Sequence, residues 1–124
     1  MRIVIPGKYP SLNEYIRACR ADKQAGNRLK KRCEQRLIDE IAVQTYGKPK
    51  ITRPVTLHYT FFEDSMRRDM DNIFSCFAKF FQDALVKAFV LDGDGWAHIR
   101  GFSAQFCVDK IRPRIEIDIE EVAP

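Results

Sequence analysis

Two acidic clusters stand in the middle of this sequence, one on each side of an apolar stretch. The first lies in the run from Arg67 to Asn72 (RRDMDN), and the second is Asp92-Gly93-Asp94. The first run falls where an expected strand gives way to an expected helix, so Asp69 and Asp71 can project into one pocket. Mg²⁺ prefers oxygen ligands and usually draws on only a few carboxylates. These two residues, with Asp94 as the third acid, would suffice for a magnesium site.

Each cluster also has an ordinary structural interpretation. An acid at the N-cap or in the first turn of a helix satisfies free amide groups and complements the positive helix end. Asp69 and Asp71 could act in that way. Aspartate is also favoured in turns that contain glycine, which would account for Asp92 and Asp94.

Positive charge is concentrated near the start of the chain. The chain has 21 Lys and Arg against 17 Asp and Glu, a formal net charge of +4. The segment from Arg17 to Arg36 carries eight of these basic residues, including Lys30 and Lys31, and only two acids. This segment is either a solvated helix face or a surface that binds phosphates. Its combination with two acidic clusters and adjacent arginines is expected where a metal site works beside phosphates.

Hydrophobic periodicity predicts six elements in the order β-α-β-α-β-β. Strands are expected at 2–5, 55–62, 98–108 and 114–122, and helices at 27–46 and 73–89. The stretch between the first strand and the first helix is rich in turn residues, so we expect a loop there. This order predicts one α+β domain, residues 1–124, in which a mostly antiparallel sheet packs against both helices. The acids at 116–121 then lie on the outer face of the last strand.

Length and composition exclude several classes of protein. A chain of 124 residues with 45% hydrophobic residues can close one core, and no apolar run approaches the length of a membrane span. The first ten residues lack the long apolar core of a signal peptide, so we expect a soluble, cytoplasmic protein. Four widely spaced cysteines form no zinc or redox motif, and we expect reduced thiols.

These motifs resemble those of the RusA family of Holliday junction resolvases from phages and bacteria. Family members carry an RxDxDN-type motif, then a helix with a lysine and a DAL segment, then an aspartate in an acidic turn. Here these features correspond to 67–72 (RRDMDN), 83–85 (DAL) and Asp94. The segment 10–15 (PSLNEY) is similar to a polar, asparagine-bearing turn after the family's first strand. The likeness covers most of the chain and is strongest from Arg67 to Asp94.

The resemblance implies a magnesium-dependent endonuclease, with Mn²⁺ as a possible substitute, that acts as a homodimer and cuts four-way DNA junctions. It implies neither an organic cofactor nor a membrane partner. Asp69, Asp71 and Asp94 would be the catalytic metal ligands. The residues expected to contact DNA are Ser11, Asn13, Lys30, Lys31, Arg67, Arg68 and Asn72.

One departure from the family pattern concerns the helix lysine. The family places it four positions after the second aspartate of the motif, where this chain has Ser75 and carries its first helix lysine at Lys79. In an ideal helix Lys79 lies about 12 Å along the axis from Asp71 and is rotated by about 80°. Lys79 is therefore a catalytic candidate only if the helix starts late or bends. Otherwise another base such as Arg68 or Lys87 substitutes, or catalysis is weakened.

The departure leaves two alternatives open. A module on the same scaffold could bind branched DNA without cutting it, or a nuclease could prefer flaps or forks.

Trp96, the only tryptophan, either packs in the structure or stacks on an exposed base. The phenylalanines between 74 and 89 are expected in the core or in a dimer interface.

Overall fold

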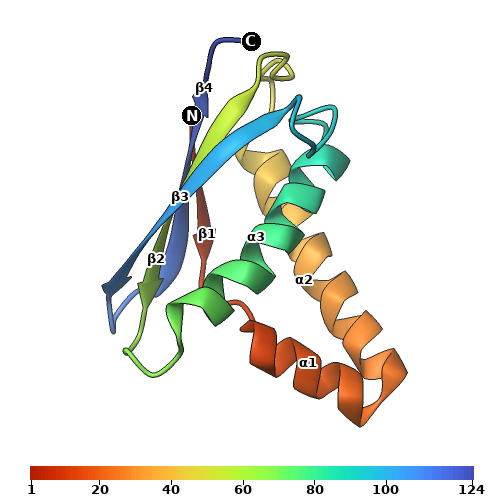
Figure 1. Ribbon diagram of the computed structural model, residues 1–124, viewed down its shortest axis with the longest axis vertical. Coiled ribbons are helices and arrows are strands. Elements are labelled where there is room, and N and C mark those ends of the chain that lie inside the picture. Colours follow the sequence, from red (N-terminus) through yellow and green to blue (C-terminus); the bar gives the residue numbers. More distant parts are fainter.

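Alternation along the central strand determines which side of the sheet is covered. In β2 (Val55–Glu63) every odd-numbered residue is buried and every even-numbered residue is half-buried. The odd-numbered side chains face the helices, which all lie on the same side of the sheet (Figure 1). The computed structural model describes residues 1–124 and has the order β-α-α-β-α-β-β. The other elements are β1 (Arg2–Pro6), α1 (Leu12–Ala21), α2 (Lys23–Gln44), α3 (Met70–Lys87), β3 (Ile99–Val108) and β4 (Arg114–Glu121).

The four strands form one mixed sheet in the order β1-β4-β2-β3. Strand β4 is antiparallel to both β1 and β2, and β3 is parallel to β2. The parallel pair follows from α3, which returns the chain across the sheet before β3 begins. The α+β class, the single domain and the six predicted elements are confirmed, although α3 starts three residues earlier than predicted and α2 four residues earlier.

The predicted order was wrong in one respect, because the expected loop before the first helix contains a further helix, α1. Ser11 is its N-cap, and Ser11 and Glu14 form a reciprocal capping box. The chain then turns sharply at Asp22, whose extended backbone ends α1 and whose side chain caps α2. Gly26 makes this corner possible, since a Cβ there would lie 2.4 Å from the Cys19 sulfur.

The core is formed where α3 packs on the sheet. Phe77 and Phe81 are fully buried and contact Tyr59, while Phe61 stacks on Phe106 of β3. The aromatic stripe of α3 is therefore core, as expected, apart from Phe89, which lies beyond the helix and is largely exposed.

Strand β4 confirms the expected placement of the acids near the end of the chain. Ile115, Ile117 and Ile119 are buried, so the intervening acids lie on the outer face, where Asp118 pairs with Arg2. The four cysteines form no disulfide. None of the helices combines the length and the apolar character that crossing a membrane requires.

Candidate active site

Asp69 and Asp71 stand where the loop after β2 enters α3. Asp69 has the extended backbone of an N-cap residue, but its side chain makes no capping hydrogen bond. Asp71 lies in the first turn, and its Oδ1 accepts a hydrogen bond of 2.9 Å from the backbone N–H of Asn72. Both side chains are exposed and Asn72 is half-buried. The capping interpretation therefore does not account for the Asp69 carboxylate, which faces solvent without a protein partner.

An open cavity of about 310 Å³ lies beside Asp69. Its polar wall comes from the end of β2 and the following loop, and its apolar wall comes from the start of α3 and the end of β3. Asp69, at the start of α3, and Cys107 and Val108, at the end of β3, are among the residues that line it. Asp69 thus lies at a depression that β3 helps to form.

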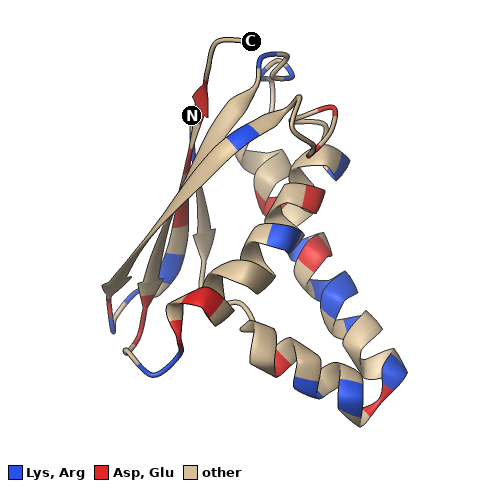
Figure 2. Ribbon diagram, in the orientation of Figure 1, with Lys and Arg blue, Asp and Glu red and all other residues tan.

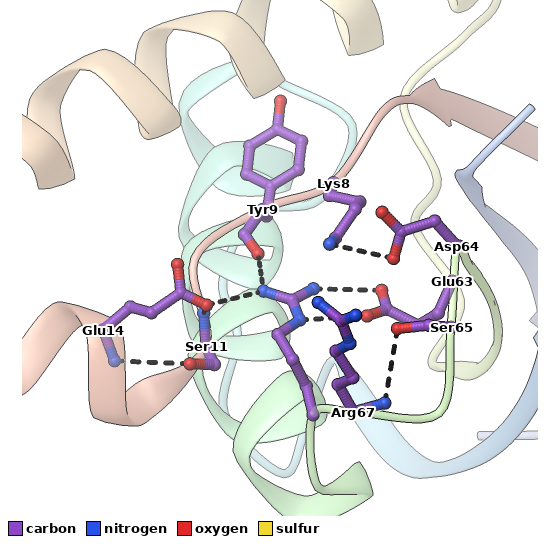
Figure 3. Close-up of polar contacts among 9 residues, drawn as sticks. Lys8, Tyr9, Ser11, Glu14, Glu63, Asp64, Ser65 and Arg67 are labelled. Atoms are coloured by element: carbon purple, nitrogen blue, oxygen red, sulfur yellow. Dashed lines mark hydrogen bonds and ion pairs between the residues drawn. The ribbon is translucent and has the colours of Figure 1, made fainter. Parts of the chain in front are cut away.

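Arg68 lies in the same loop and makes four hydrogen bonds within the chain. Its Nε and Nη2 atoms donate to the two carboxylate oxygens of Glu63 at 2.9 and 3.0 Å. Its Nη1 donates to the carbonyl oxygen of Tyr9 at 2.6 Å and to Glu14 at 3.0 Å. Figure 3 shows the three partners of this guanidinium: Glu63 at the end of β2, Tyr9 in the segment before α1, and Glu14 on α1. The network fixes the loop that carries Asp69.

This geometry corrects the expected role of Arg68. The Arg68 side chain is only 17% exposed and that of Glu63 8% exposed, so the pair is largely buried, and four of the five N–H donors of the guanidinium are already used. Arg68 therefore has a structural role, and it also lines the cavity beside Asp69. Arg67 differs, because its side chain is exposed and only its backbone N–H is bonded, to Ser65.

Ser11 is also corrected from a DNA contact to a helix cap. It is 5% exposed, and its hydroxyl accepts the backbone N–H of Glu14 at 3.3 Å. Asn13, two positions along, is exposed and remains available to a ligand. Although desolvation opposes the charged form, hydrogen bonds from Arg68 and Ser11 lower the pKa of Glu14 below its usual range. The segment 10–15 therefore links α1 to the site loop.

Sequence reasoning missed Glu14 and Glu63, and the strand pattern held a signal for the second. The alternation in β2 places Glu63 in phase with the buried residues Tyr59 and Phe61. A carboxylate on the buried face of a strand requires a charged or hydrogen-bonding partner. Two arginines follow within five residues. The pairing of Glu63 with one of them was therefore accessible from the sequence.

Lys79 does not reach the two aspartates in this chain. Helix α3 starts at Met70 and continues to Lys87, so it neither starts late nor is interrupted before Lys79. Lys79 is exposed and pairs with Asp83, one turn further on, at 3.4 Å. Ser75 takes the position of the family lysine, and its hydroxyl donates to the Asp71 carbonyl oxygen at 2.6 Å. Lys87, the other candidate base, is paired with Glu34.

Replacing Lys79 by alanine should therefore leave any nuclease activity within about twofold of the wild-type rate, because an exposed i,i+4 ion pair contributes only a few tenths of a kcal/mol. Initial rates on the same DNA substrate check this. A loss of tenfold or more would show that Lys79 reaches a reacting group after all, through a second chain or a changed helix.

Asp94 lies at the opposite end of α3 from the other two aspartates. The helix has 18 residues and is about 27 Å long, and Asp94 follows its C-terminal end. Within one chain, no three His, Cys, Asp or Glu side chains lie close enough to hold a metal ion together. The expected triad of Asp69, Asp71 and Asp94 is therefore not assembled within one subunit. Asp69 and Asp71 remain neighbours in the chain, at the N-cap and in the first turn of α3.

The basic segment forms the corner between α1 and α2. Lysines and arginines run along the end of α1, around the turn, and over the first half of α2 (Figure 2). Lys31 is exposed, whereas Lys30 is half-buried. Two acids interrupt this region: Asp22, which pairs with Arg28, and Glu34, which is buried and held by Lys87. Most of the cations therefore remain free to meet an anionic partner.

Comparison with known proteins gives no independent assignment. No protein-family model matches the chain, and no curated protein is detectably similar to it.

Proposed function

We propose that this protein is a RusA-type, magnesium-dependent endonuclease that cuts branched DNA, with four-way junctions as its substrate. The observation that carries this proposal is the exposed pair Asp69 and Asp71, two residues apart at a strand-to-helix junction. Arg67 is exposed on the same loop, where it can hold a neighbouring phosphate. The basic corner of α1 and α2 provides further charge for the DNA backbone.

The donor set suits Mg²⁺. Both side chains offer carboxylate oxygens, Asp69 has no competing hydrogen bond, and Asp71 uses one oxygen for a local amide. A bound Mg²⁺ would supply stabilisation of negative charge on the scissile phosphate. The carboxylates position water for in-line attack, and Arg67 holds the DNA strand. Hydrolysis by water needs no covalent enzyme intermediate.

If Asp94 is a ligand of the same metal ion, it must come from a second copy of the chain. The surface on which we place that copy is the free edge of β3. Strand β3 pairs with β2 along one edge and leaves its other edge free. This strand has ten residues, contains no proline and carries a single charge, at Arg100. Phe102 and Val108 are 58% and 45% exposed. A long, nearly uncharged edge strand is a template for pairing with another chain.

Antiparallel pairing of β3 with β3 of a second copy would complete the acidic site. In a two-fold arrangement the segment before β3 in one copy lies at the end of β3 in the other. That segment includes Asp94. The end of β3, at Cys107 and Val108, lines the same cavity as Asp69. The proposed homodimer therefore has two sites, each with Asp69 and Asp71 from one subunit and Asp94 from the other.

A mixed dimer tests this arrangement. Asp71→Asn and Asp94→Asn should each be inactive alone. A heterodimer of the two should retain one intact site, because the Asp94→Asn subunit keeps its Asp69 and Asp71 and receives Asp94 from its partner. The measurement is nicking of a labelled four-way junction after the two variants are co-folded with different affinity tags and purified through both.

Three outcomes of the mixing experiment have distinct meanings. Recovered single-strand nicking supports a shared site. No recovery by a stable heterodimer contradicts it, since a site built within one chain would be broken in both subunits. Full activity of Asp94→Asn alone would remove Asp94 from the chemistry.

Changing both Lys30 and Lys31 to alanine should weaken binding to junction and duplex DNA alike. If both contact phosphates, the slope of log K against log salt should fall by up to about 2. Fluorescence anisotropy over a salt series in EDTA measures this without cleavage. An unaltered slope would show that this part of the corner is outside the DNA interface.

One observation favours a second candidate function, a module that binds branched DNA without cutting it. Ser75 occupies the position of the family lysine, and Lys79 is paired with Asp83. This alternative predicts tight junction binding with no cleavage at any Mg²⁺ or Mn²⁺ concentration. Cleavage of a labelled four-way junction with Mg²⁺ and with EDTA separates the two functions.

A further inference from the structure

Trp96 has no structural role within the chain. It is the only tryptophan and is 92% exposed, so packing in the core does not explain it. The turn that carries it is nevertheless well defined, because the Gly95 carbonyl oxygen accepts the backbone N–H groups of His98 and Ile99, each at 2.9 Å. An exposed indole on an ordered turn is available for contact with a molecule outside the subunit.

The surroundings of Trp96 suit a nucleobase. Arg100 Nε donates to the Trp96 carbonyl oxygen at 2.9 Å, which places a guanidinium beside the turn. Trp96, Arg100, Ile99 and Phe102 line an open depression of about 230 Å³. An aromatic ring with an adjacent arginine is the combination on which unpaired bases stack while the cation attracts the phosphate backbone.

The position of Trp96 in the chain connects it with the proposed active site. It follows Asp94 by two residues, within about 7 Å of backbone. If Asp94 lies at the scissile phosphate, the indole must lie near a nucleotide next to the cut. It also precedes β3, so it is outside the strand that we propose to pair with a second copy.

We propose that Trp96 stacks on an unpaired base at the branch point of the DNA. This inference rests on the proposed function and adds a residue that selects branched over continuous DNA. In an uninterrupted duplex each base is stacked on its neighbours and offers no free face, whereas bases at a branch can be unstacked at low cost. The stacking energy would then be gained only at the branch.

The single tryptophan provides a direct readout. Intrinsic fluorescence is followed while the protein binds an unlabelled four-way junction in EDTA, with a linear duplex compared at equal occupancy. Stacking on a base should quench Trp96 strongly on the junction and only weakly on the duplex. Unchanged emission at saturation would overturn the proposal, as would equal quenching by duplex. An emission that reports a buried indole in the DNA-free dimer would overturn it in favour of a subunit contact.

Variants separate this inference from the nuclease proposal. Trp96→Ala should bind the junction about 5- to 150-fold more weakly, the range expected for one lost base stack, with little change for duplex. Trp96→Phe should restore most of the loss, which a merely structural defect would not predict. Wild-type junction binding by Trp96→Ala would overturn the stacking role even if the wild type cuts DNA. Quenching by a protein that never cuts would support stacking and contradict the nuclease.

Discussion

Asp71→Asn is expected to lower magnesium-dependent cleavage by about 1,000-fold or more while DNA binding stays unchanged or becomes tighter. The substitution removes one charged oxygen ligand at nearly constant volume, and the stabilisation that a catalytic metal provides amounts to several kcal/mol of the barrier. It also removes a negative charge from a surface that faces phosphates. Single-turnover cleavage and anisotropy titration of the same junction measure both effects.

The control for this variant is Asp39→Asn, which changes an exposed aspartate on α2 in the same way. It should cut like the wild type. Wild-type cleavage by Asp71→Asn would remove the metal site from the position that we assign to it. Equal loss in both variants would indicate an effect of net charge and not of a metal ligand.

Arg68→Ala is expected to destabilise the fold by about 3–5 kcal/mol. Glu63 is buried, and removal of its partner leaves a carboxylate without compensation, which is the costly way to break a buried ion pair. The variant also loses the hydrogen bonds to the Tyr9 carbonyl oxygen and to Glu14. Urea unfolding followed by circular dichroism measures the change in the free energy of unfolding.

The neighbouring residue supplies a matched control. Arg67→Ala removes an exposed side chain and should change stability by no more than about 0.5 kcal/mol. If Arg67 holds a phosphate, this variant should reduce the salt slope of DNA binding by about 1. If the Arg68→Ala protein is stable and its DNA binding has a reduced salt slope, Arg68 contacts the DNA and the structural role that we assign to it is contradicted.

The sequence predicted the helices and strands correctly wherever a periodic hydrophobic pattern extended over a whole element. The alternation of β2 and β4 and the aromatic spacing of α3 gave the strands, the main helix and the buried face. The pattern of α1 was hidden because Pro10 and Asn13 suggested a turn. The capping pair Ser11 and Glu14 was the signal that a helix begins there.

The candidate site was only partly predictable for a different reason. Asp69 and Asp71 are neighbours in sequence, so local geometry decides their proximity. The distance of Asp94 from this pair depends on the length of α3 and on the position of β3 in the sheet. No local sequence pattern encodes that position. Arg67 and Arg68 look equivalent in the sequence, and only the burial of Glu63 shows which of them turns inward.

We propose above all that this protein hydrolyses branched DNA with the help of a divalent metal. The most direct test is incubation of the purified protein with a labelled synthetic four-way junction and a matched linear duplex, each with Mg²⁺ and with EDTA. We expect paired nicks near the branch point, present only with Mg²⁺ and absent from the duplex. Tight junction binding without cleavage would contradict the nuclease in favour of the binding module, and equal degradation of the duplex would contradict selectivity for branched DNA.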